Sequence, residues 1–88
     1  MKIYDYSGRK NVCGSRIREE RKKRRLSQTD LAARLQVRGV TLERDSVSRI
    51  ELGTRFIADY ELMVIASILS IPIEELLPDT VLRRSSDT

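Results

Sequence analysis

The sequence contains no histidine, no tryptophan, one cysteine and one phenylalanine in 88 residues. A lone cysteine cannot form a disulfide within the chain, and metal sites built from histidine or from several cysteines are excluded. The same absences leave no candidate catalytic group with a partner, and the sequence has neither a glycine-rich phosphate loop nor a paired-carboxylate motif. We therefore expect no enzyme activity, no cofactor and no small-molecule substrate.

Long hydrophobic segments are also absent. No run of about 18 apolar residues occurs, which argues against a membrane span, and residues 1–10 lack an apolar stretch of signal-peptide length. A cytoplasmic location is therefore expected. Two prolines, four glycines and 40% hydrophobic residues favour one small, ordered and mostly helical domain.

Positive charge is concentrated in the first part of the chain. Residues 1–55 carry fifteen Lys and Arg against seven Asp and Glu (net +8), whereas residues 56–88 carry two against six (net −4). Such asymmetry is typical of a protein with a surface for a polyanion. A generally basic, solvated surface is the alternative interpretation.

Residues 27–53 have the pattern of two short helices joined by a turn. Ser27 and Asp30 have the spacing of a capping box, and Leu31 and Leu35 recur on one face of the first helix. We also expect a helix over residues 15–25.

The second helix of this pair is expected to begin near Arg44 and to end at Gly53, because glycine most easily adopts the left-handed conformation that follows a helix. Val47 and Ile50 give it only a narrow buried stripe, so its other side chains must face outward. A helix fixed along one edge, with hydrogen-bonding groups on the other, is suited to insertion into a DNA groove.

Two stretches of this pattern, S-Q-T-D-L-A at residues 27–32 and V-S-R-I-E-L-G at 47–53, resemble the S-Q-x-x-L-A and I-S-x-I-E-x-G motifs of phage-repressor-type (Cro or XRE) helix-turn-helix domains. The resemblance implies an all-α fold, a compact five-helix lambda-repressor-like helix-turn-helix domain over residues 14–78. An N-terminal arm (1–13) would precede it and a short C-terminal tail (79–88) would follow. A fourth helix is expected from Asp59, and a fifth between Pro72 and Pro78.

The connection between the two central helices departs from the family pattern. The interval from Gln28 to Glu51 is about five residues longer than in typical members, whose turns are tight. We expect the helix that starts near residue 28 to extend by about one turn and the chain then to loop through Gly39, with Leu42 in the apolar position before the next helix.

The resemblance also implies roles for individual residues. It places four residues where relatives contact base edges: Arg44, Asp45, Ser48 and Arg49. Arginine matches the two acceptors of guanine and aspartate accepts from cytosine, which suggests a half-site containing G·C pairs. Gln28 matches a phosphate contact of relatives, and further phosphate candidates are Thr29, Arg38 on the turn and Arg55 after Gly53. Arg21 and Glu51 match a buried ion pair that ties two helices together.

For Asp45, for the cations at 21–25 and for the N-terminal arm, the sequence supports a second interpretation equally well. Asp45 can orient a neighbouring arginine by a salt bridge instead of contacting a base. The five cations at 21–25 can attract phosphates or simply complement the negative end of a helix dipole. Lys2, Arg9 and Lys10 of the arm can lie along DNA, or the arm can be a leader that contributes little.

These features predict a sequence-specific DNA-binding transcriptional regulator, a repressor that binds a palindromic operator in double-stranded DNA as a homodimer. The subunit contact is expected at Leu76, Leu77, Val81 and Leu82, with the N-terminal arm as second choice. The alternative function is an antitoxin-like or adaptor module that uses the same fold to bind a protein partner.

Overall fold

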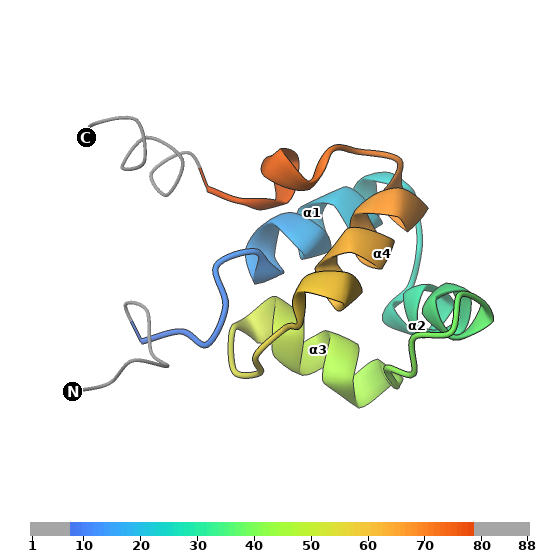
Figure 1. Cartoon of the computed structure of the whole chain (residues 1–88), viewed down its shortest axis with the longest axis horizontal. Coiled ribbons are helices and arrows are strands. Elements are labelled where there is room, and N and C mark those ends of the chain that lie inside the picture. The colour runs from blue at the N-terminus through green and yellow to red at the C-terminus, as the bar shows by residue number, and fades with distance from the viewer. Residues whose placement is uncertain (1–7, 79–88) are drawn as a thin grey trace.

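The computed structural model describes residues 8–78. In this part of the chain, four α-helices, α1 (Gly14–Lys23), α2 (Gln28–Val37), α3 (Arg44–Leu52) and α4 (Asp59–Leu69), are followed by the 3-10 helix η1 (Ile73–Leu76). Helix α3 packs against both α1 and α2, α2 also packs against α4, and η1 lies against α1 and α4 (Figure 1). None of these helices is long and apolar enough to cross a membrane.

The helix pair predicted at residues 27–53 is present as α2 and α3. The Ser27 hydroxyl accepts a hydrogen bond from the Asp30 N–H, and the Asp30 carboxylate accepts one from the Ser27 N–H, each at 2.9 Å. This is the predicted capping box, which satisfies two of the backbone groups left open at a helix start. Helix α3 ends at Gly53, whose φ of 82° is the left-handed conformation expected there.

The connection between α2 and α3 occupies residues 38–43, longer than the three or four residues usual in a helix-turn-helix. Gly39 has a positive φ of 84°, which reverses the chain after α2. Val40 and Leu42 then turn inward and are buried. The long turn is therefore anchored by apolar packing at two points and holds the start of α3 in place.

One contiguous set of side chains forms the core. Its members are Cys13, Ile17, Leu31, Leu35, Val40, Leu42, Val47, Ile50, Ile65, Ala66, Leu69 and Leu76. Helix α1 contributes a single aliphatic residue, Ile17, so it must also be held by polar contacts. Burial raises the pKa of the Cys13 thiol to about 11, which keeps it protonated and unreactive near neutral pH.

The predicted fifth α-helix is wrong, because residues 73–76 form only one 3-10 turn. Prolines 72 and 78 bound a segment too short to offset the cost of nucleating an α-helix. The tighter i to i+3 pattern forms instead, with the Glu75 N–H donating to the Pro72 carbonyl at 3.0 Å and the Leu77 N–H to the Glu74 carbonyl at 3.1 Å.

The same turn overturns part of the predicted subunit contact. Leu76 is fully buried in the core of the domain, and Leu77 is partly buried against it. Leu76 therefore cannot present its side chain to a second copy. Val81 and Leu82, the other residues of that prediction, lie outside the described residues.

Part of the predicted N-terminal arm packs onto the helical domain. The Lys10 N–H donates to the Gly53 carbonyl at 2.8 Å, and the Asn11 side chain is buried between the start of α1 and the end of α3. Residues 1–7, with Lys2, and residues 79–88 lie outside the described part of the chain.

Candidate nucleic-acid interface

Helix α3 is attached to the domain along one edge. Val47 and Ile50 are buried, whereas Arg44, Asp45 and Arg49 are exposed and Ser48 is half-buried. The four predicted base-contact residues thus lie on the accessible part of one helix. No part of residues 8–78 covers the two arginines, so a groove of DNA can approach them.

Arg44 and Asp45 are loosely paired at the start of α3. Their closest approach, from Arg44 Nη1 to Asp45 Oδ1, is 3.5 Å, and their side chains are 62% and 76% exposed. An ion pair this exposed contributes little free energy. Asp45 is therefore close enough to orient Arg44 while its carboxylate remains accessible to a base edge.

Beneath this surface, Glu51 joins three helices. Its Oε2 accepts from Arg21 Nε of α1 at 2.7 Å, and its Oε1 accepts from Arg21 Nη2 at 3.0 Å. The same Oε1 accepts from Gln28 Nε2 of α2 at 3.0 Å. The two charged side chains are 8% and 2% exposed, and this hydrogen bonding raises the pKa of the Arg21 guanidinium. The pair implied by the family resemblance is therefore a buried, two-pronged contact that fixes α3 against α1.

Gln28 and Thr29 occupy the first turn of α2. The Gln28 amide holds Glu51 with one N–H, and because a side-chain amide carries two, the other can still donate to an acceptor outside the domain. Thr29 is exposed. The backbone N–H groups of this turn that the capping box does not use add positive potential, which favours a phosphate at this end of the helix.

Arg38 and Arg55, two of the predicted phosphate contacts, form hydrogen bonds within the domain. The Arg38 guanidinium donates to Ser67 Oγ at 2.7 Å and lines a hollow between α2 and α4, so it is not grouped with the residues of α3. The Arg55 guanidinium donates to the Phe56 carbonyl at 2.8 Å and to Glu61 Oε1 at 3.2 Å. Glu61 also accepts from the Ala58 N–H at the start of α4, so Arg55 takes part in fixing that helix.

The cations at the end of α1 are largely paired within the domain. Glu20, buried on α1, accepts from Arg24 at 2.8 Å and from Lys23 at 3.2 Å. These hydrogen bonds, with that of Arg24 the stronger, lower the pKa of the Glu20 carboxyl. With Arg21 bound to Glu51, only Lys22 and Arg25 of the cluster are exposed and without a carboxylate partner within residues 8–78.

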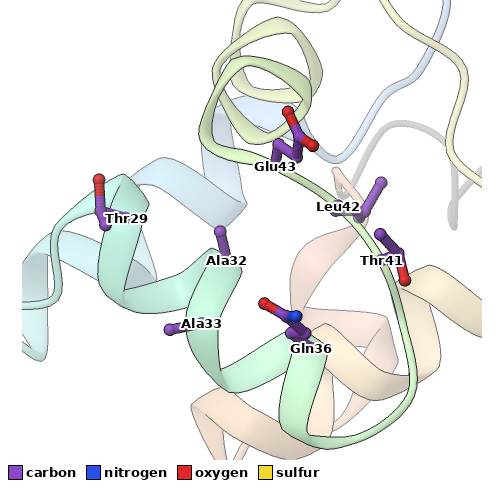
Figure 2. Close-up of a pocket in the computed structure, with 7 residues that line it drawn as sticks. All are labelled: Thr29, Ala32, Ala33, Gln36, Thr41, Leu42 and Glu43. Carbon is purple, nitrogen blue, oxygen red and sulfur yellow. The ribbon is translucent and has the colours of Figure 1, made fainter.

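The long turn creates a hollow of about 250 Å³ beside the start of α3 (Figure 2). Its lining residues are Thr29, Ala32, Ala33 and Gln36 of α2 with Thr41, Leu42 and Glu43 of the turn. The alanines and the leucine supply apolar surface, and the other four supply hydroxyl, amide and carboxylate groups without a cation. The hollow therefore offers hydrogen-bonding groups and apolar surface beside the start of α3.

Patterns in the sequence did not indicate three further residues of this region. Gln36 and Glu43 line the hollow. The unusual length of the turn beside them was the feature of the sequence that could have indicated them. Asn11 gave no such signal, because its partners are distant carbonyl groups at Ile50 and Arg55.

The chain also resembles a protein of known structure. The chain is similar to the crystal structure of the DNA-binding domain of BldD, with a TM-score of 0.63 and 24% sequence identity over 76% of this chain and 90% of that chain. No family model matches the sequence, and no curated protein is similar to it in sequence. The likeness shows the fold: over the matched part of the chain, the helices are arranged as they are in the BldD domain.

Proposed function

We propose that this protein is a sequence-specific DNA-binding transcriptional regulator that inserts α3 into the major groove. The observation that carries the proposal is the attachment of α3 by Val47, Ile50 and Glu51, which leaves Arg44 and Arg49 projecting outward. The BldD domain, which shares the fold, is described as DNA-binding.

In this proposal different residues supply affinity and sequence choice. Arg44, Asp45, Ser48 and Arg49 contact base edges, and Glu43 joins them from the hollow at the start of α3. The first turn of α2, with Gln28 and Thr29, binds a phosphate and fixes the depth of insertion.

We further propose that the protein is a repressor that acts in the cytoplasm on a palindromic operator. One inserted helix reads only a few base pairs, so two copies related by a twofold axis, with half-sites about one helical turn apart, are needed for a selective site. A dimer seated on its operator excludes other proteins from it, which is the simplest regulatory outcome.

The test is selection of bound duplexes from a random library, followed by titration of the selected duplex across a salt series. The expected result is an enriched palindrome and an affinity that falls steeply with salt. If no sequence is enriched and the response to salt is flat, the proposal is wrong and the adaptor function is favoured.

A single substitution tests the assignment of α3. Arg49→Ala should cost about 1–3 kcal/mol on the selected site and relax the base preference at one position. An equal loss on all sequences would show that Arg49 contacts the backbone instead.

For the dimer we propose a surface that replaces the predicted contact at Leu76. Tyr60 and Met63 lie three residues apart on α4, so they share a face, and they are 57% and 56% exposed. Met63→Glu should shift sedimentation from dimer to monomer. Val37→Glu, at an 88% exposed site on α2, is the matched control and should leave the dimer intact. Two variants that sediment alike would refute this surface.

A further inference from the structure

Residues 9–14 are fastened to the far end of α3, the end away from Arg44. Asn11, 8% exposed, donates from Nδ2 to the Ile50 carbonyl at 3.0 Å and to the Arg55 carbonyl at 2.8 Å. Its Oδ1 accepts from the Gly14 N–H at 2.8 Å and from the Cys13 N–H at 3.2 Å. One buried side chain thus joins the start of α1 to the end of α3 and to the loop that follows.

Close backbone contacts reinforce this attachment. A Cβ atom at Gly14 would collide with the Ile50 carbonyl oxygen, so α1 and α3 approach more closely here than any other residue would permit. At Gly53 the aliphatic stem of Arg9 lies where a side chain would be, with the Arg9 Cγ 3.3 Å from that position. The Lys10 N–H also donates to the Gly53 carbonyl. The segment is therefore attached to α3 by side-chain and backbone contacts.

This fixed segment carries two exposed cations, Arg9 and Lys10. Neither has a carboxylate partner within residues 8–78. The Lys10 ammonium lies over the Phe56 ring, 5.3 Å from its centroid, which limits where the side chain goes without neutralising its charge. Both cations are thus held at a defined place beyond the end of the recognition helix.

We propose that Arg9 and Lys10 form a DNA-phosphate site at the end of α3, with Asn11 as the residue that positions it. The inference rests on the proposed function and adds to it a second backbone anchor, opposite the first turn of α2. Anchors at both ends of α3 would fix its register along the groove, since phosphate contacts set orientation while base contacts set sequence. A site fixed before binding also loses less conformational entropy than a mobile arm would.

A purely structural role makes a different prediction. Cations near the carboxyl end of a helix are stabilised by its dipole, and Lys10 over Phe56 adds a cation–π contact. If that were their whole role, removing both charges would lower the melting temperature and leave the salt dependence of DNA binding as it was.

The experiment compares two double variants of the full chain that lose equal charge. Arg9→Gln with Lys10→Gln removes the proposed site. Arg18→Gln with Arg34→Gln is the control, because both arginines are exposed and neither is among the residues proposed to contact DNA. Binding to the selected duplex and to a random duplex is titrated between 50 and 200 mM salt, on the order of the range over which such contacts weaken.

For the first variant we expect the slope of log affinity against log salt to be shallower by about 2, close to 0.9 for each phosphate contact, with the same loss on both duplexes. The control should keep a slope near that of the wild type. Asn11→Ala should reproduce the shallower slope although both cations remain. The proposal is overturned if the first variant and its control have equal slopes, or if only the melting temperature changes.

Two outcomes separate this inference from the proposed function. A wild-type chain that binds no duplex at all would overturn both. A wild-type chain with a steep slope and an enriched palindrome, beside an Arg9 and Lys10 variant of unchanged slope, would overturn the phosphate site alone.

Discussion

Replacing Glu51 by alanine should destabilise the domain more than any other change of a charged residue. The Glu51 side chain is 2% exposed and accepts three hydrogen bonds, two from Arg21 and one from Gln28. Its removal leaves a guanidinium buried without its counter-ion, a change that costs about 3–5 kcal/mol. A domain of this size is stable by roughly 4–11 kcal/mol, so the loss is a large fraction of the total.

Thermal unfolding followed by circular dichroism measures this cost. With about 4–8 °C of melting temperature for each kcal/mol in a domain this small, Glu51→Ala should melt at least about 12 °C below the wild type. Glu19→Ala is the matched control, because the Arg16–Glu19 pair is 3.6 Å apart and 41% and 63% exposed; it should cost less than about 0.5 kcal/mol.

A double-mutant cycle separates the pair from its burial. Arg21→Met with Glu51→Leu removes both charges and restores apolar volume, so it should cost less than the sum of Arg21→Met alone and Glu51→Leu alone. If Glu51→Ala costs under about 1 kcal/mol, or if the two sites prove additive, the reasoning about a buried, coupled pair is refuted.

Two further substitutions test the packing and charges of α1. Gly14→Ala should destabilise by about 1–3 kcal/mol or more, because the new methyl group meets the Ile50 carbonyl; a gain in stability, as alanine brings to an open helix position, would disprove the close approach. Glu20 has a lowered pKa in the folded state, so its contribution to stability is present above its unfolded pKa and is lost as pH falls through the folded one. Glu20→Gln should therefore flatten the acid limb of a stability–pH curve; an unchanged limb would assign that loss to other carboxylates.

Local signals in the sequence predicted the parts of the fold that are stabilised locally. The capping box of Ser27 and Asp30 and the helix end at Gly53 each depend on backbone groups only a few residues away. The outward face of α3 followed from the narrow stripe of Val47 and Ile50. These features need no knowledge of the rest of the chain.

Features that depend on residues far away in the sequence could not be predicted from local patterns. Asn11 is buried because carbonyl groups 39 and 44 residues away accept its hydrogen bonds, and no periodicity in the sequence records that arrangement. Leu76 was assigned to a subunit contact because an apolar residue near a helix end looks the same whether it faces its own core or a partner. The positions of Arg38 and Arg55 were decided by Ser67 and Glu61, which lie on another helix.

The Asn11 contacts also bear on the order in which the domain folds during synthesis. The Arg55 carbonyl is added to the chain 44 residues after Asn11, and α1 by itself buries a single aliphatic side chain, Ile17. Helix α1 is therefore only marginally stable until α3 and the loop after it have formed and pack against it. A nascent chain arrested before Arg55 has emerged from the ribosome should be cleaved by protease within α1, whereas the released full chain should be protected there.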